Sequence, residues 1–149
     1  MRYCAFAFVC LFLFSACSQD QTDSEEKYSQ QALAFAEAYF NYDYKEASKL
    51  VTPESRKWLS FAASNITQED IDLINAQDGA TVTVSDFTYY NDSTAMVTLD
   101  VENFVRKDTL FRSASVIEKD RFRLEVVRRD REYLVKMEGL PQSERQNRD

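Results

Sequence analysis

The first half of the chain has apolar residues at helical spacing. They recur every three or four positions, as in a helix with one buried face. The clearest series is Tyr28, Ala32, Phe35 and Tyr39, and the alanines of this stretch favour helix and close packing. The sequence therefore predicts a long amphipathic helix that ends near Asn41.

Helix-start signals divide this half of the chain into four predicted helices. Each signal pairs a capping side chain with an acid three residues later, or places proline at the first helical position. The four starts are Asp23 with Glu26, Asp43 with Glu46, Thr52 with Pro53, and Thr67 with Asp70. Apolar residues follow each start, so we expect every one of these helices to bury one face.

The apolar period shortens to two after Gly79, which is the spacing of strands with one buried face. The alternation predicts strands at residues 82–90, 96–102, 109–118, 121–126 and 133–137. Asp120 lies between two of them and is a position for a bend or a bulge. Helices followed by a meander of strands predict an α+β domain, with N-terminal helices packed on a curved antiparallel sheet.

Residues 1–16 have neither pattern. Arg2 precedes an apolar run of about a dozen residues, which is too short to cross a hydrocarbon core of ~30 Å as a helix. This arrangement is typical of a secretory signal peptide. The run ends in Phe14-Ser15-Ala16-Cys17, which resembles a bacterial lipobox, although Phe14 stands where that pattern prefers leucine.

The lipobox resemblance implies a lipid anchor. Residues 1–16 would be removed, Cys17 would be acylated, and residues 17–24 would be the lipidated cysteine and a polar tether. Membrane lipid would then be a partner of the chain, and the cell envelope its location. Ser18 in place of aspartate implies, by the same resemblance, sorting to the outer membrane. A plain signal peptide with Cys17 merely nearby is the alternative.

Composition narrows the chemistry of the remaining chain. The 149 residues carry a net charge of −7 and include no histidine and two glycines. Histidine-based zinc sites and catalytic triads are therefore excluded, as are glycine-rich phosphate loops. All three cysteines lie in the first 17 residues, so no disulfide framework is available beyond them. We expect no metal site, no cofactor and no nucleic acid, whose phosphates would repel an acidic protein.

Residues 25–140 are long enough for one domain, while residues 141–149 carry no apolar side chain after Leu140 and are expected to be disordered.

Two features of the domain resemble the nuclear-transport-factor-2-like (cystatin-like) superfamily. They are the helix pair Ala34–Phe40 and Tyr44–Leu50, and the terminal hairpin Phe122–Lys136. More narrowly, the layout is similar to that of small bacterial lipoproteins of unknown function. The hairpin lacks the usual Asp-Gly turn, and the helical segment at 67–77 is extra.

The superfamily resemblance implies a cone in which some members bind or transform a small apolar ligand. It further implies that an enzyme would use an aspartate base with a tyrosine or a second acid in the pocket. Candidate acids are Asp86, Asp100, Glu102 and Glu118, and candidate hydroxyls are Tyr39 and Tyr89. No motif selects among them, and Asp100 and Glu102 are explained more simply as the solvated face of a strand.

Aromatic residues supply the candidate ligand contacts. Apolar-face positions are occupied by Phe35, Tyr39, Trp58, Phe61, Phe104 and Phe122, where core packing and a ligand pocket are both open interpretations. The candidate pocket-binding residues are Tyr39, Trp58, Tyr89 and Phe104. The tyrosines that fit the stripes less well, as exposed contacts or as the rim of the cone, are Tyr42, Tyr44 and Tyr90.

A basic cluster stands out in this acidic chain and consists of Arg121, Arg123, Arg128, Arg129 and Arg131. Acids alternate with these arginines at strand spacing, which favours cross-strand ion pairs on a solvated sheet face. An anionic ligand or partner is the alternative for this cluster.

Together these observations predict a lipid-anchored envelope protein of the binding or assembly kind that is not an enzyme. Its partner would be a small apolar ligand or an envelope protein. One alternative is a small-ligand isomerase or hydrolase that uses a pocket carboxylate. Another is a structural accessory subunit of an envelope complex. The sequence indicates no oligomeric state.

Overall fold

The computed structural model describes residues 17–107 and 113–145, and of residues 17–20 it describes the backbone alone. The helices are α1 (Cys17–Phe40), α2 (Tyr44–Ala47), α3 (Arg56–Ser64) and α4 (Gln68–Asn75), with a 3-10 turn at Pro53–Ser55 before α3. The strands are β1 (Thr81–Asn91), β2 (Thr94–Arg106), β3 (Ser115–Arg129) and β4 (Glu132–Lys136). None of the described helices is both long and apolar enough to cross a membrane.

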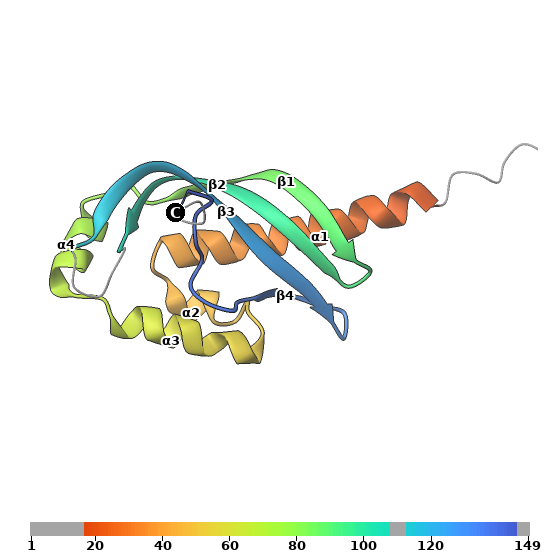
Figure 1. Cartoon of the computed structure of the whole chain (residues 1–149), viewed down its shortest axis with the longest axis horizontal. Helices are drawn as coiled ribbons and strands as arrows, with labels where there is room; N and C mark the ends of the chain where they lie inside the picture. Colours follow the sequence, from red (N-terminus) through yellow and green to blue (C-terminus); the bar gives the residue numbers. More distant parts are fainter. Residues whose placement is uncertain (1–16, 108–112, 146–149) are drawn as a thin grey trace, which may run out of the picture.

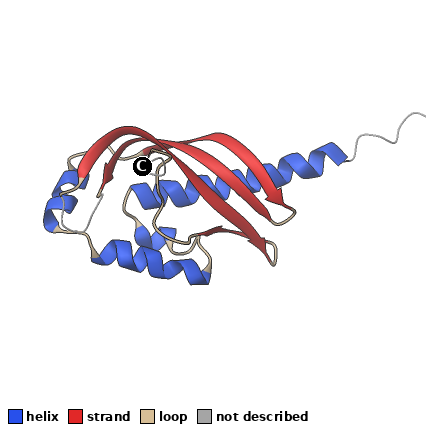
Figure 2. Ribbon diagram, in the orientation of Figure 1, coloured by secondary structure: helices blue, strands red, loops and turns tan. Residues whose placement is uncertain are grey.

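Among the described residues the strands form one antiparallel sheet in the order β1-β2-β3-β4, so each strand pairs with its neighbour along the chain. The sheet curves strongly, with α1, α2 and α3 on its concave side and α4 at one end (Figure 1). Figure 2 shows the same separation of helices from strands. The predicted α+β class, with N-terminal helices on a curved antiparallel sheet, is confirmed.

The long helix α1 lies in the curve of the sheet and touches all four strands. Its inward face consists of Tyr28, Ala32, Phe35 and Ala36, each at most 1% exposed. Tyr28 also meets β4 through Tyr133, whose ring centroid lies 4.7 Å away in an edge-to-face arrangement. The face that the sequence period predicts is therefore the face that the helix buries.

Three of the four predicted helix starts agree with the structure and one does not. Thr52 is the N-cap of the 3-10 turn, in which Pro53 takes the first position. The side chain of Asp43 accepts a hydrogen bond from the Glu46 N–H at the start of α2, and Thr67 forms a capping box at the start of α4. By contrast, α1 already begins at Cys17, so Asp23 lies inside the helix and does not cap it. Residues 17–24 contain neither glycine nor proline, so nothing in them stops the helix from extending.

The prediction of two separate strands at 109–118 and 121–126 is wrong, because β3 runs without a break from Ser115 to Arg129. Asp120 pairs in register with Val101 of β2, and no bulge occurs there. The Asp120 carboxylate stays inside the strand because Arg106 of β2 pairs with it at 3.0 Å. Residues 108–112 lie outside the described part of the chain.

The sequence predicts that residues 141–149 are disordered, but the first five of them, residues 141–145, are ordered in the structure. The strand β4 covers the edge of β3 from Glu125 onward and leaves the preceding edge of β3 open. Ser143 fills this edge by pairing with Phe122 and is fully buried. Residues 146–149 of the predicted tail, and the predicted signal peptide at 1–16, lie outside the described residues.

Replacing Phe35 by alanine should lower the free energy of unfolding by about 3–5 kcal/mol, because its ring is fully buried in the core. Urea titration followed by Trp58 fluorescence measures the change. Phe61→Ala is the matched control, since the Phe61 ring is 45% exposed and its truncation should cost about 1 kcal/mol. Equal losses in the two variants would contradict the burial of this face of α1.

Candidate functional site

A cavity of about 280 Å³ lies where the C-terminal end of α1 meets the curve of the sheet. Its walls come from α1, α2, α3 and α4, from β2 and β3, and from the segment after β4. The aromatic rings among its lining residues are Tyr39, Phe40, Tyr42, Tyr44, Phe61, Phe104 and Phe122. The cavity is therefore bordered by elements from both halves of the chain, and aromatic rings form much of its lining.

Three phenylalanine rings make up the innermost wall of this cavity. Phe40 of α1 packs on Phe104 of β2 at 5.2 Å and on Phe122 of β3 at 4.6 Å between ring centroids. Phe104 and Phe122 are 5.6 Å apart, and both are only 1% exposed. This triplet joins the helix to two strands and gives the cavity a rigid apolar wall.

Three tyrosines surround the turn between α1 and α2. Tyr39 and Tyr44 lie with ring centroids 5.6 Å apart, and Tyr42 lies 5.7 Å from Tyr44. Tyr42 has a left-handed backbone with φ of 65°, and its hydroxyl donates to the Val105 carbonyl oxygen at 2.9 Å. Neither the Tyr39 hydroxyl nor the Tyr44 hydroxyl bonds to another residue within the described ranges. These two hydroxyls are available to a ligand in the cavity.

Burial keeps these tyrosines protonated. Removal from water raises the pKa of Tyr39 and of Tyr44 far above the ordinary value of 10.0, and neighbouring tyrosines raise both further. The same burial raises the pKa of Tyr42 to about 12. A neutral phenol has one O–H to donate, so Tyr39 and Tyr44 present hydrogen-bond donors at every physiological pH.

A buried ion pair forms the polar part of the wall. The Lys107 ammonium donates to Asp70 Oδ2 at 2.6 Å and to the Asn65 carbonyl oxygen at 2.9 Å. Burial alone would raise the pKa of Asp70. The hydrogen bonds from Lys107 and Thr67 outweigh that effect and lower the pKa to about 2. Asp70 is therefore an anion at neutral pH, and Lys107 has a third N–H to donate.

A second ion pair lies at the rim. Arg106 Nη1 donates to Asp120 Oδ2 at 3.0 Å, and the Arg121 backbone N–H donates to Asp120 Oδ1 at 2.9 Å. The consecutive residues Arg106 and Lys107 thus reach two different carboxylates, one on β3 and one on α4. Both carboxylates are only 3% exposed. The rim is polar, with each of these cations matched to an acid.

The structure brings two of the four candidate pocket residues to this cavity, Tyr39 and Phe104. Trp58 is half-buried against the core instead, with the Lys57 ammonium 5.1 Å from its ring. Tyr89 lies near the N-terminal part of α1, where its hydroxyl donates to the Gln21 carbonyl oxygen at 3.3 Å.

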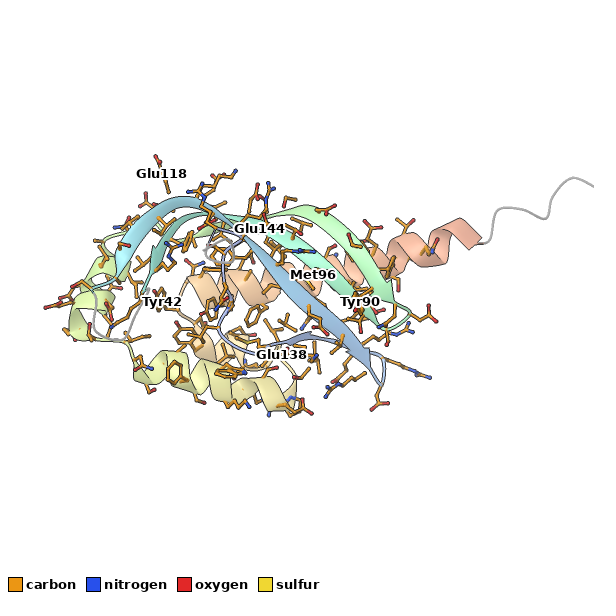
Figure 3. All side chains as sticks on the ribbon, in the orientation of Figure 1. Tyr42, Tyr90, Met96, Glu118, Glu138 and Glu144 are labelled. Atoms are coloured by element: carbon orange, nitrogen blue, oxygen red, sulfur yellow. The ribbon has the colours of Figure 1, made fainter. Side chains whose placement is uncertain are left out.

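The candidate acids chosen from the sequence do not line this cavity. Asp100 pairs with Arg121 at 2.7 Å, and Glu102 pairs with Lys119 at 2.7 Å. Glu118 points away from the convex face of the sheet, whereas Tyr42 lies between the sheet and the helices (Figure 3). These cross-strand pairs agree with the interpretation that Arg121 belongs to a solvated sheet face on which acidic and basic side chains alternate.

Sequence reasoning missed the pair that the cavity does contain. Asp70 is recognisable from the sequence only as a helix-start acid paired with Thr67, and Lys107 belongs to no pattern. One signal could have found them. The helix at 68–75 contains no basic residue that could pair with Asp70, and Lys107 follows directly after a buried strand. The contact joins residues 37 positions apart, which a single sequence does not encode visibly.

No protein-family model matches the chain, and no curated protein matches it in sequence. Among solved structures, a protein of Novosphingobium aromaticivorans superposes with a TM-score of 0.52 at 16% identity. The match covers 86% of this chain and 98% of that chain. The Novosphingobium protein is provisionally described as an aromatic ring hydroxylase.

The fold of this chain, with helices packed on a curved four-stranded antiparallel sheet, is similar to that of proteins described as NTF2-like. A protein of Streptomyces avermitilis, provisionally described as a dehydratase of the NTF2-like family, has a TM-score of 0.48 at 15% identity, over 77% of this chain and 92% of its own. A provisional NTF2-like transpeptidase of Campylobacter jejuni has a TM-score of 0.46 at 16% identity, over 73% and 96%. At these identities the likeness concerns the fold alone, and at that level the NTF2-like resemblance is confirmed.

The prediction that the chain is not an enzyme requires correction. It depended on the missing histidine and on the absence of a recognisable motif. The Novosphingobium protein has a similar fold and is provisionally described as an aromatic ring hydroxylase, so this fold does not argue against catalysis. The cavity also gathers a carboxylate, an ammonium group and neutral hydroxyls, and such groups transfer protons without histidine.

The Asp70–Lys107 pair predicts a pH dependence of stability. The folded-state pKa of about 2 lies below the ordinary 3.8, so the contribution is complete above about pH 4 and is lost as the pH falls towards 2. Its size is on the order of 2 kcal/mol. Asp70→Asn should therefore lower the free energy of unfolding at pH 7, and the difference from the parent should shrink towards pH 2.

Urea unfolding at a series of pH values measures this difference. Asp72→Asn is the matched control, because Asp72 lies on the exposed side of α4. The control should follow the parent at every pH. A difference between Asp70→Asn and the parent that stays constant down to pH 2 would contradict the lowered pKa of Asp70.

Proposed function

We propose that the protein is an enzyme of the isomerase or hydrolase kind that acts on a small, largely apolar molecule bound in the cavity. The observation that carries this proposal is the pair of neutral hydroxyls of Tyr39 and Tyr44, two residues that line an aromatic cavity. Neither hydroxyl has a hydrogen-bond partner among the residues that the structure describes. A ligand oxygen that accepts from both would satisfy them. The substrate would therefore carry a carbonyl or a similar acceptor on an apolar frame.

The size and walls of the cavity favour a compact ring compound. A volume of about 280 Å³ lies just below the usual range of small-molecule sites, roughly 300–1,000 Å³. Phe40, Phe104 and Phe122 offer ring faces and edges against which a planar molecule can stack. A substrate of one or two rings fits these walls.

The polar groups suit proton transfer next to a carbonyl. Hydrogen bonds from Tyr39 and Tyr44 would stabilise the negative charge that develops on the oxygen when a neighbouring C–H is deprotonated. Asp70 is the carboxylate among the described residues of the cavity, and it is ionised, as a proton acceptor must be. Because its pKa is low, Asp70 is a weak base and depends on the tyrosines to acidify the substrate.

Hydrogen exchange of a model ketone tests this chemistry. In deuterated water the full-length protein should accelerate exchange of the α-protons of 2-tetralone, followed by NMR. Tyr39→Phe and Tyr44→Phe should each reduce the acceleration about 10- to 100-fold, since each removes one donor to the developing charge. Asp70→Asn should abolish the acceleration.

Tyr89→Phe is the matched control, because this tyrosine lies outside the cavity and should leave the exchange rate unchanged. A wild-type rate equal to that of buffer alone would refute the proposal. So would wild-type rates in both cavity tyrosine variants.

We further infer that the chain is held at the outer membrane of the cell envelope by lipid on Cys17. The sequence Phe14–Cys17 supports this inference, as does the course of α1. The first turns of α1 extend beyond the sheet (Figure 1), and residues 21–23 are exposed. The proposed lipid would lie at the end of α1 opposite to Tyr39 and the cavity.

Labelled palmitate tests the anchor in cells that express the full-length chain. The wild type should incorporate label and fractionate with membranes, and Cys17→Ser should lose both properties because the acceptor thiol is gone. Cys10→Ser is the control and should keep the label. Labelling that survives in Cys17→Ser would overturn the anchor.

A further inference from the structure

The chain after β4 crosses the cavity before it ends, and we name residues 138–145 the strap. Its root is fixed where the Met137 backbone N–H donates to the buried Ser55 Oγ at 2.8 Å. Its far end is fixed where Ser143 pairs with Phe122 and the Glu144 N–H donates to the Arg121 carbonyl oxygen at 2.9 Å. Figure 3 labels residues near both ends, Glu138 beside β4 and Glu144 beside β3.

The middle of the strap forms part of the cavity wall. Leu140, Pro141 and Gln142 line the cavity, yet residues 139–141 make no hydrogen bond to any other part of the described chain. Most of the other lining residues lie on a helix or on a paired strand, and the exceptions are Tyr42, Asn65, Ile66 and Lys107. A Cβ at Gly139 would meet nothing within 4 Å, so this part of the strap borders open space. The strap is thus a wall that can move without breaking a helix or a strand pairing of the main sheet.

The far end of the strap is also linked to the cavity rim. Asp120 Oδ1 lies 3.7 Å from Arg145 Nε of the strap, and Asp120 Oδ2 accepts from Arg106 Nη1 at 3.0 Å. Arg106 itself lines the cavity. One buried carboxylate therefore contacts both the strap and a residue that lines the cavity.

We propose that the strap is the gate of the cavity, which swings from its root at Met137 when the pairing of Ser143 and Glu144 with β3 opens. This inference rests on the proposed ligand site and adds how that site is reached. Ligand passes while the far end is detached, and re-pairing with β3 encloses the ligand behind Leu140 and Gln142. Short edge pairings of this kind open locally at a far lower cost than global unfolding.

A disulfide between positions 121 and 144 would lock the gate. These positions are opposite each other because Ser143 pairs antiparallel with Phe122, and opposite residues lie within the Cα separation that a disulfide spans. The test protein is the full chain with Arg121→Cys and Glu144→Cys, in which the native cysteines are changed to serine. Stopped-flow fluorescence follows its association with 7-methoxycoumarin, a planar bicyclic carbonyl compound, before and after oxidation.

Oxidation should slow association about tenfold or more, and reduction should restore it, because the locked strap denies access. A control disulfide between Glu102→Cys and Lys119→Cys, which are opposite each other on β2 and β3, should leave association unchanged. Equal rates in the oxidised and reduced test protein would overturn the gate. Failure of the wild type and of both forms to bind would instead overturn the proposed ligand site, and the gate with it.

Amide hydrogen exchange gives a second measurement that needs no ligand. The Glu144 N–H should exchange about 100-fold faster or more than the Val135 N–H, which donates to the Leu50 carbonyl oxygen in the core at 2.9 Å. Equal protection of the two amides would show that the strap opens only when the whole domain unfolds. That result would overturn the gate whatever the cavity binds.

Discussion

The close contact between the alanines of α1 and the curved sheet determines where the rest of the molecule lies. Ala32 and Ala36 are fully buried, and their small side chains let the helix backbone sit deep in the curve. One turn later the small residue is replaced by Phe40, whose ring packs on Phe104 and Phe122. The larger rings hold helix and sheet apart at this end, and the cavity lies beside them.

The periodic parts of this fold could be predicted from the sequence, because α1 and the strands of the meander each bury a single face. The residues at which helices and strands begin and end depend on long-range contacts, which the sequence pattern does not show. The pattern around Asp120 suggests an interruption, yet a buried carboxylate paired with Arg106 is as compatible with a strand as an apolar side chain. Ser143 reads as part of a polar tail, but the open edge of β3 gives its backbone a partner.

The candidate site could be predicted in part for a similar reason. Tyr39 and Phe104 fall on apolar faces, and these faces meet at the cavity. Trp58 is equally apolar, but α3 places it against the core, and it does not line the cavity. The apolar period of a sequence indicates that a side chain is buried. It does not indicate whether that side chain contacts another side chain or a ligand. The Asp70–Lys107 contact was out of reach, because it joins a helix cap to the end of a strand.

The helix α1 provides a packing surface for the sheet, and its length also fixes the distance between Cys17 and the cavity. Its 24 residues correspond to about 36 Å along the axis, with Cys17 at one end and Tyr39 near the other. A helix fixes both the length and the direction of a connection, whereas a flexible polar linker fixes neither. Lipid on Cys17, as proposed above, would therefore let the cavity lie up to about 36 Å from the bilayer, where it meets molecules dissolved in water before those dissolved in the bilayer.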